Sequence, residues 1–252
     1  MFNLSGRKAL VTGGSRGIGR ATVILLAKAG CDVAFNYVRN AAAADEVKIL
    51  VGKAGKECLA VKAELSREEE ARGLVEVAAD RWGRVDILVN NHGIWTYGEM
   101  GNMSAAVWEE TMRVNLDGVF HVTNAVVPLM KAQRGGRIIY VSSTAAVRGE
   151  AFHSHYAASK GALHSLTKSL AAELGPYNIN VNCVAPGWVD TDMSAEAFSD
   201  PAFRKAVEES IPLKRIPFPE DIAGPIVFLA SDLARHITGA IINVNGGGVL
   251  SG

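Results

Sequence analysis

Short apolar runs rich in β-branched residues alternate along the chain with longer amphipathic or alanine-rich runs. The short runs are almost continuously apolar, which is typical of strands buried on both faces. Strands are predicted over residues 8–13, 32–37, 57–63, 85–91, 136–143, 178–187 and 240–248. Helices are predicted over residues 17–30, 41–54, 67–82, 104–132 and 154–175.

Seven strands that alternate with helices predict an α/β fold with a parallel sheet covered by helices on both faces. No linker, repeat or low-complexity segment interrupts the pattern, so we expect residues 1–252 to form a single doubly wound domain. Residues 190–220 interrupt the alternation of strands and helices, because they are polar and contain four prolines after a strand end. We expect a substrate lid at about 190–220; a plain surface excursion is the alternative.

The charge balance gives no sign of a polyanionic partner. Lys plus Arg and Asp plus Glu both number 26, so neither nucleic acid nor an anionic membrane surface is expected to bind. The three cysteines are widely spaced and form no CxxC pair, so neither a disulfide framework nor a metal site is expected. No charged leader or long apolar run occurs, and we therefore expect a soluble, cytoplasmic protein.

A glycine-rich turn, "TGGSRGIG" at 12–19, follows the first predicted strand and opens the first helix. Backbone N–H groups and the helix dipole make such a turn an anion site, and glycine permits close approach. A simple tight turn is the alternative, but the strand–turn–helix context favours dinucleotide binding. The turn residues expected to contact the dinucleotide are Gly13, Ser15, Arg16, Gly17, Ile18 and Gly19.

The end of the second strand bears on which dinucleotide binds. An acid there would hold the ribose 2′-OH of NAD and repel a 2′-phosphate. Tyr37 stands at that position, Arg39 follows two residues later, and Arg16 lies in the glycine turn. Forked arginine donors suit a phosphate, so NADP(H) is favoured over NAD(H). The alternative is that both arginines are merely solvated.

Tyr156 and Lys160 stand four residues apart in "YAASK", on one face of a predicted helix. A nearby ammonium favours tyrosinate and should lower the tyrosine pKa, which would suit a general acid or base. A solvated surface pair is the alternative reading.

Polar residues elsewhere in the sequence favour a role of Tyr156 and Lys160 in proton transfer. Ser143 stands at the carboxyl end of a strand, 13 residues before Tyr156, and could bind a substrate oxygen. Ser142 is its competitor, because strand alternation directs only one of the two into the site. Asn115 interrupts an apolar helix and needs a hydrogen-bond partner, which could be purely structural.

The sequence resembles the short-chain dehydrogenase/reductase family over nearly its whole length. The matching segments are "TGGSRGIG", "NNHG" (90–93), Asn115, Ser143, "YAASK" (156–160), "PGWVDTDM" (186–193) and "ITGAIINVNGG" (237–247). The segment at 211–232 is similar to members of the β-ketoacyl-(acyl-carrier-protein) reductase-like branch. The resemblance implies a Rossmann-type fold and a homotetramer with interfaces at 104–132 and 154–175.

The resemblance also implies a catalytic tetrad of Asn115, Ser143, Tyr156 and Lys160. Tyr156 would protonate the carbonyl oxygen as hydride arrives, and Ser143 would polarise that carbonyl. Lys160 would lower the pKa of Tyr156 and bind the nicotinamide ribose, while Asn115 would hold a water that connects Lys160 to solvent. Further cofactor contacts implied by the family are Glu64, Leu65, Asn91, Gly93, Pro186, Gly187, Val189 and Thr191.

Two residues depart from the family pattern. His92 stands where alanine is usual and Glu64 where aspartate is usual. We expect His92 to pack near the cofactor without a catalytic role. Trp95, Phe152 and Trp188 are expected to give an apolar or aromatic substrate pocket, with plain core packing as the alternative. His153 is expected to line that pocket.

The function predicted from these observations is NADPH-dependent reduction of a ketone, most similar to 3-oxoacyl-(acyl-carrier-protein) reduction. A secondary-alcohol, sugar or steroid dehydrogenase is the alternative within the family, and a non-catalytic dinucleotide-binding regulator is the alternative outside it. The substrate is a small-molecule or acyl-thioester ketone, and acyl-carrier protein is a candidate partner. An acidic carrier would need a basic patch, for which Arg134, Lys214 and Arg215 are candidates; Tyr177 and Asn178 weaken this reading.

Overall fold

The computed structural model describes residues 3–250 and contains a seven-stranded sheet in the order β3-β2-β1-β4-β5-β6-β7. All neighbouring strands are parallel, which confirms the predicted α/β class. The strands are β1 (Lys8–Val11), β2 (Asp32–Tyr37), β3 (Cys58–Lys62), β4 (Ile87–Asn90), β5 (Gly136–Val141), β6 (Ile179–Pro186) and β7 (Ile241–Val244). The strand order reverses beside β1, so the carboxyl ends of β1 and β4 open a crevice there.

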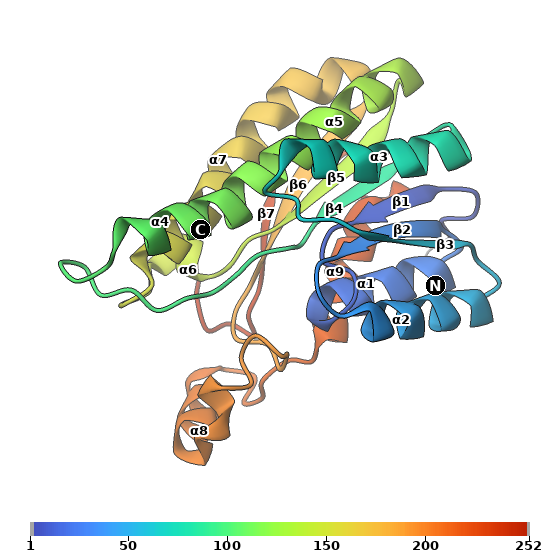
Figure 1. The fold of residues 1–252 in the computed structure, drawn as a ribbon. Helices are drawn as coiled ribbons and strands as arrows, with labels where there is room; N and C mark the ends of the chain where they lie inside the picture. The colour runs from blue at the N-terminus through green and yellow to red at the C-terminus, as the bar shows by residue number, and fades with distance from the viewer. Residues whose placement is uncertain (1–2, 251–252) are drawn as a thin grey trace.

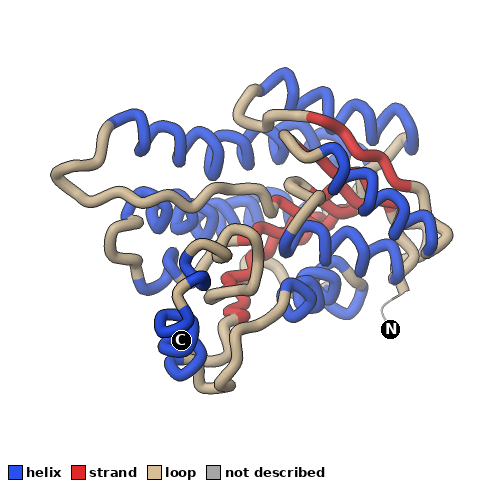
Figure 2. The backbone as a smooth tube through the Cα atoms, turned by 60° about the horizontal axis from the view of Figure 1, so that its bottom comes forward, coloured by secondary structure: helices blue, strands red, loops and turns tan. Residues whose placement is uncertain are grey.

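Helices cover both faces of the sheet (Figures 1 and 2). One face carries α1 (Gly17–Lys28), α2 (Ala41–Lys53) and α9 (Pro219–Ala230). The other face carries α3 (Glu68–Trp82), α5 (Gly118–Gln133) and α7 (Ser154–Leu174). Successive strand residues alternate between the two cores: Leu88 packs with the second group of helices and Val89 with the first. The nearly continuous apolar runs of the strands are therefore explained by burial on both sides.

The main differences from the sequence prediction lie in three segments. The helix predicted over 104–132 is divided into α4 (Ala105–Met112), a π-helical turn η1 (Arg113–Asp117) and α5. Helix α9 was not predicted, although Pro219 suits its first turn and Pro225 is tolerated inside it. The segment 190–220 is not wholly irregular, because it contains helix α8 (Pro201–Ser210), whose first turn is capped by the Asp200 side chain.

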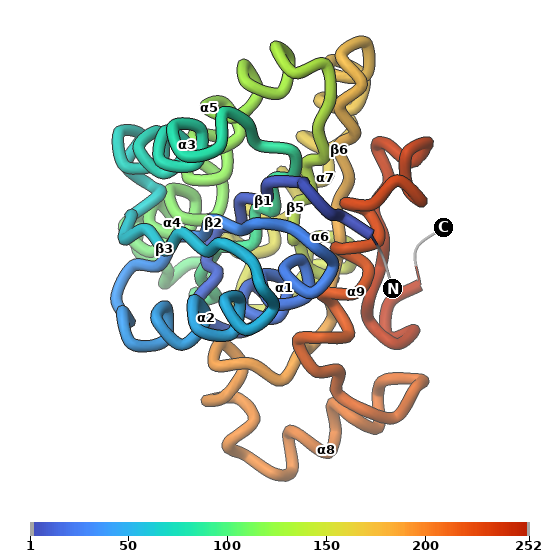
Figure 3. The backbone as a smooth tube through the Cα atoms, turned by 90° about the vertical axis from the view of Figure 1, so that its right-hand side faces the viewer, coloured from blue at the N-terminus to red at the C-terminus, as the bar shows by residue number. Residues whose placement is uncertain are grey.

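Helix α8 stands apart from the layered body, as both Figure 1 and Figure 3 show. It has its own small apolar cluster, in which Phe198, Val207, Ile211 and Ile216 are buried and Trp188 packs against them. The segment is therefore held by local packing and joins the body at the carboxyl end of β6, next to Pro186.

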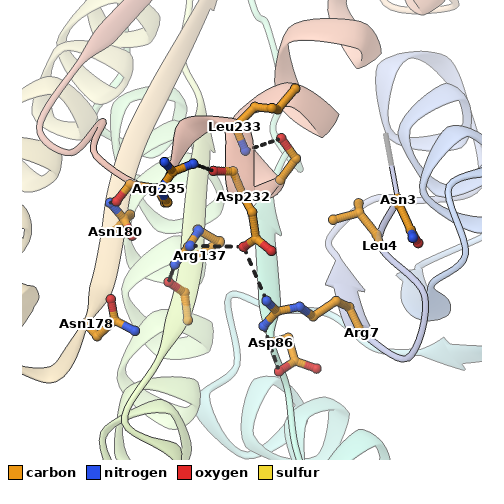
Figure 4. Close-up of polar contacts among 12 residues, drawn as sticks. Asn3, Leu4, Arg7, Asp86, Arg137, Asn178, Asn180, Asp232, Leu233 and Arg235 are labelled. Carbon is orange, nitrogen blue, oxygen red and sulfur yellow. Dashed lines mark hydrogen bonds and ion pairs between the residues drawn. The ribbon is translucent and has the colours of Figure 1, made fainter. Parts of the chain in front are cut away.

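The amino edge of the sheet is closed by an ion-pair network (Figure 4). Arg7 Nη2 donates to Asp232 Oδ1 at 3.3 Å, and Arg137 Nη2 lies 3.6 Å from the same oxygen. Arg7 also approaches the buried Asp86, with 3.8 Å between Nη1 and Oδ1. These contacts join β5 and the residues just before β1 and β4 to the turn η4 (Asp232–Ala234), which follows α9, at the edge opposite to the glycine turn.

Candidate active site

A cleft of about 570 Å³ lies at the carboxyl ends of the strands. Every residue predicted to act in catalysis or to bind the cofactor lines this cleft except Gly19 and Asn115, which lie behind its wall. Its walls also include residues that we did not single out from the sequence as site residues, among them Asn36, Arg148 and Glu150. Ligands of open α/β sheets bind at this edge, so the position agrees with the fold.

The two serines after β5 point in different directions. Ser142 is buried, donates to the main-chain oxygen of Lys160 at 3.0 Å and lies 2.9 Å from Nε2 of His164. Its hydroxyl is thus occupied against α7. Ser143 lines the cleft, accepts a hydrogen bond from the Ala145 amide at 3.1 Å and is hydrogen-bonded to Tyr156. Of the two, Ser143 is the one placed to meet a ligand.

Tyr156 lies in the first turn of α7 and is buried. Burial raises the pKa of its hydroxyl to about 12; the hydrogen bond with Ser143 lowers the pKa, and the nearby charge of Glu150 raises it further. The expectation that Lys160 lowers this pKa is not met here, because burial has the largest effect and Lys160 does not contribute. In this structure Tyr156 is a protonated phenol at neutral pH.

Lys160 follows one turn later, also buried, and its Nζ donates to the main-chain oxygen of Val141 at 3.0 Å. Burial lowers its pKa to about 8. Gly93 faces the ammonium: a Cβ at that position would lie 3.2 Å from Nζ and 3.1 Å from Oδ1 of Asn115. A side chain at this position would thus crowd the ammonium and the Asn115 amide.

Asn115 occupies the π-helical turn and is fully buried. Its Oδ1 accepts from the Ile94 amide at 2.8 Å, and its Nδ2 donates to the Ile94 oxygen at 2.9 Å and to Ser159 Oγ at 3.1 Å. The polar residue in an apolar helix therefore has the partners it needs. These bonds fix the loop after β4 against α7, one residue from Lys160.

The glycine turn connects β1 to α1 in a conformation suited to an anion. Gly13 and Gly17 have φ of 67° and 52°, which favours glycine at both positions. Helix α1 begins at Gly17 without a side-chain cap, so its first N–H groups remain for a ligand. Asn36 shapes the turn, since its Oδ1 accepts from the Gly13 amide at 2.8 Å. We did not predict this role for Asn36, although a polar residue inside the apolar strand "DVAFNY" signals it.

The expected adenine end of the cleft carries two exposed arginines. Arg39 follows β2, and Arg16 lies 67 % exposed with Nη1 only loosely paired, 3.9 Å from Asp192. No acid stands at the end of β2, where Tyr37 lines the cleft. Glu64 is partly engaged, because its Oε1 accepts from the Ser66 hydroxyl at 3.1 Å. A 2′-phosphate would meet arginine here, so these residues fit NADP(H).

The side chains of Asn91 and His92, both in "NNHG", support the glycine turn. Asn91 Nδ2 donates to the oxygens of Thr12 at 3.0 Å and Gly13 at 3.3 Å. His92 Nδ1 lies 2.7 Å from Thr12 Oγ1. Burial and the charge of Lys160 lower the pKa of His92 to about 3, so its ring is neutral. His92 packs near the expected cofactor site, as predicted.

The end of the cleft beside β6 is formed by Pro186, Gly187, Val189 and Thr191, and Thr191 also lies next to Gly17 of the glycine turn. Ser194 holds this loop, since its hydroxyl donates to the Val189 oxygen at 2.6 Å and the Thr191 amide donates to it at 3.1 Å. The loop leads directly into the segment that carries α8.

An aromatic corner adjoins this end. Trp95 and Trp188 line the cleft with their rings edge to face at 5.6 Å. His153 stacks on Trp95 at 4.3 Å but is not among the residues that line the cleft, so its expected pocket role is not supported. Phe152 is 54 % exposed and stacks on Tyr97, also outside the cleft lining, so its expected pocket role is not supported either.

Within residues 3–250 no group of three or more His, Cys, Asp or Glu side chains is arranged to hold a metal ion. Nor is any helix in this range long and apolar enough to cross a membrane.

Comparisons with known proteins agree with this architecture. A family model described as Enoyl-(Acyl carrier protein) reductase matches residues 13–248. A 3-oxoacyl-[acyl-carrier-protein] reductase of Synechocystis sp. is 40 % identical over 99 % of this chain and 100 % of its own length. An L-rhamnose 1-dehydrogenase (NAD(P)(+)) of Sphingomonas sp. is 39 % identical over 97 % and 96 %.

Solved structures agree as well. A putative short-chain alcohol dehydrogenase from Sinorhizobium meliloti has a TM-score of 0.93 and 36 % identity, covering 98 % of this chain and 97 % of its own. Levodione reductase has a TM-score of 0.91 and 32 % identity, covering 96 % and 97 %. The chain therefore belongs to the short-chain dehydrogenase/reductase family of NAD(P)-dependent oxidoreductases, which act on CH–OH and C=O groups.

Proposed function

We propose that this protein interconverts a ketone and a secondary alcohol with NADP(H), and that Tyr156 transfers the proton. The observation that carries the proposal is the meeting of Ser143, Tyr156 and Lys160 in one cleft wall beside the glycine turn. The nicotinamide supplies or accepts the hydride when it is bound. Protein side chains then supply only orientation, polarisation and a proton.

Tyr156 is suited to give a proton to a carbonyl oxygen, because its raised pKa keeps it protonated at neutral pH. Ser143, already bonded to Tyr156, would donate to the same carbonyl oxygen and stabilise the negative charge that develops there. In the oxidative direction Tyr156 would accept the alcohol proton, which requires its pKa to fall when positive charge arrives nearby.

Lys160 and Asn115 would support this transfer. A lysine with a pKa of about 8 retains its charge in most molecules near pH 7 and can bind the nicotinamide ribose. Both amide hydrogens of Asn115 are engaged, so a water that links Lys160 to solvent would bond to an oxygen of Asn115.

The preference for NADP(H) is supported by Arg16 and Arg39 and by the absence of an acid at the end of β2. We expect kcat/KM for NADPH to exceed that for NADH, and Arg39→Ala to reduce the ratio by about tenfold or more. Arg72→Ala, on the exposed face of α3, is the matched control. Equal use of both cofactors by the unmodified protein would refute the preference.

For the substrate, two of the relatives named above point to different classes, one being a 3-oxoacyl-[acyl-carrier-protein] reductase and the other an L-rhamnose 1-dehydrogenase. The structure gives little support to the acyl-carrier-protein class, because the predicted basic patch is not assembled at the cleft. Arg134 ends α5 at the amino edge of the sheet, away from the cleft, and Arg215 is paired with Asp221 at 2.6 and 2.8 Å. Lys214 has no acidic partner among the described residues, but its Nζ donates to the main-chain oxygen of Glu209 and it does not line the cleft, so acyl-carrier protein stays a weaker proposal as a partner.

We also propose a homotetramer with interfaces on α4, α5 and α7. Trp108 on α4 and Phe120 on α5 are 40 % and 53 % exposed in the single chain, which supports coverage by another subunit. Light scattering of the purified protein tests the subunit number directly.

The test of the catalytic proposal is reduction of cyclohexanone and of a 3-oxoacyl thioester with NADPH. Tyr156→Phe removes the proton donor and keeps the shape, so turnover should fall by about two orders of magnitude or more. Near-normal turnover by this variant with unchanged NADPH affinity would exclude Tyr156 as the acid. Absence of turnover of any ketone by the unmodified protein would favour a non-catalytic dinucleotide-binding role.

A further inference from the structure

Glu150 places a carboxylate in the substrate end of the cleft. It lies in the loop between α6 (Ala145–Arg148) and α7, and its side chain is 18 % exposed. Its Oε1 accepts from Trp95 Nε1 at 3.3 Å and lies 3.9 Å from His153 Nδ1. Within residues 3–250 its carboxylate has no lysine or arginine partner inside 4 Å. The charge is therefore only partly satisfied by the protein.

The carboxylate also lines the same cleft as Tyr156. Its negative charge is one of the causes that raise the pKa of the Tyr156 hydroxyl, so the two groups interact electrostatically. Glu150 and Tyr156 both line the cleft, with Trp95 and Trp188 beside them. A substrate whose reacting oxygen meets Tyr156 would thus bring its neighbouring atoms toward Glu150.

An ionised carboxylate only accepts hydrogen bonds. The groups around the ketone of a 3-oxoacyl thioester are carbonyl oxygens, sulfur and CH₂, none of which donates a conventional hydrogen bond. Such a substrate would displace water from Glu150 without replacing its bonds, which is unfavourable for a partly buried charge. A sugar or polyol has hydroxyl donors on the carbons next to the reacting one, and the tryptophans can cover its C–H surface.

We propose that Glu150 is a specificity-determining residue, which accepts a hydrogen bond from a hydroxyl on the carbon adjacent to the reacting carbinol. The substrate class is then a vicinal diol, as in sugars and polyols, and its α-hydroxy ketone in reverse. This inference rests on the proposed function. Oxidation breaks one carbinol C–H and one O–H bond and forms the C=O double bond: the hydride reduces NADP⁺, the deprotonated form of Tyr156 receives the proton and becomes the phenol, and the adjacent hydroxyl is unchanged.

The experiment compares two alcohols that differ by one hydroxyl. NADP⁺-dependent oxidation of trans-1,2-cyclohexanediol and of cyclohexanol is measured on the purified full chain, and kcat/KM is expressed as the ratio of diol to mono-alcohol. We expect a ratio of about ten or more, since a hydrogen bond to a charged group has that effect. Glu150→Gln should lower the ratio by about fivefold or more.

Two further variants make the result specific. Glu109→Gln removes an exposed carboxylate of α4 that does not line the cleft, and its ratio should equal that of the unmodified protein. Glu150→Asp keeps the charge but shortens the side chain by one methylene group. It should lower the ratio of diol to mono-alcohol oxidation as well. NADPH binding by each variant shows that the fold and the cofactor site are intact.

The outcomes separate the inference from the proposed function. A ratio near one in the unmodified protein, or the same ratio in Glu150→Gln, overturns the role of Glu150 while turnover of both alcohols sustains the proposed function. A higher kcat/KM for a 3-oxoacyl thioester than for 2-hydroxycyclohexanone also overturns the substrate class. No turnover of either alcohol or of cyclohexanone, with NADPH still bound, overturns the proposed function itself.

Discussion

Lys160 donates a hydrogen bond from Nζ to the main-chain oxygen of Val141, the last residue of β5, at 3.0 Å. The bond joins α7 to the strand that delivers Ser143, so the helix carrying Tyr156 is held against the strand end. It also places a charged group where burial opposes ionisation, and the pKa of Lys160 falls to about 8 as a result. The site thus includes a lysine that costs stability at neutral pH.

Lys160→Met should therefore stabilise the protein while abolishing turnover. The pKa of Lys160 falls from 10.5 to about 8 on folding, so below pH 8 the fold is destabilised by about 3 kcal/mol, at about 1.4 kcal/mol per pKa unit. Between pH 8 and 10.5 the unfolded chain binds more protons, and the penalty disappears as the pH rises. Urea unfolding at pH 7 and pH 10 measures this, and the advantage of the variant should shrink at pH 10. If Lys160→Met were no more stable than the unmodified protein at pH 7, burial of the Lys160 charge would not destabilise the fold.

Glu150→Gln should shift the pH dependence of alcohol oxidation to lower pH. Burial has the largest effect on the pKa of Tyr156, but the Glu150 charge adds to the rise, so its removal eases formation of the tyrosinate that accepts the proton. We expect the apparent pKa of kcat/KM for oxidation to fall by about 0.5–1 units. Glu109→Gln should leave the profile in place. An upward shift in Glu150→Gln would contradict the electrostatic account.

His92 should make the fold sensitive to acid. Its pKa is lowered from 6.5 to about 3, so between these values the unfolded chain binds a proton that the folded protein excludes. Stability should fall as the pH drops through this window, by on the order of 1.4 kcal/mol per pH unit. His92→Ala should reduce the loss of Tm between pH 7 and pH 4.5, whereas replacement of the exposed His236 should not. Equal losses in both variants would show that other groups dominate.

The order and type of most elements could be predicted from the sequence because the strands are buried on both faces, which makes their apolar runs continuous. Helix α9 was missed because it contains Pro219 and Pro225, which ordinarily mark loops. The division of the helix at 104–132 depends on the bonds of Asn115 to Ile94 and Ser159, and those are tertiary contacts.

Site residues could be predicted from the sequence where the residue type and its position together indicate a single chemical role. A serine at a strand end and a tyrosine one helical turn from a lysine meet this condition. The choice between Ser142 and Ser143 depended on packing, because α7 and His164 occupy the hydroxyl of Ser142. Glu150 could not be singled out, since an acid in a loop is ordinarily solvated and only the fold places it in the same cleft as Tyr156. Arg134 was wrongly predicted to lie near the site for the same reason, because only the fold shows that it lies at the amino edge of the sheet.

The glycine turn gives the final prediction, which contrasts two helical glycines. A Cβ on Gly19 would clash with the Gly13 oxygen, whereas a Cβ on Gly73 in α3 would meet nothing within 4 Å. Gly19→Ala must displace the main chain of the turn, so we expect a loss of about 1–3 kcal/mol and at least a tenfold weaker affinity for NADPH. Gly73→Ala should stabilise α3 by about 0.5–1 kcal/mol and leave NADPH affinity unchanged.

Thermal unfolding and fluorescence titration with NADPH measure both variants under the same conditions. If Gly19→Ala bound NADPH as tightly as the unmodified protein, the turn would not be the phosphate site, because the substitution cannot leave the Gly13 carbonyl and its neighbouring amides in place. A loss of stability without a loss of affinity would mean that Gly19 serves only the packing of α1 against the turn.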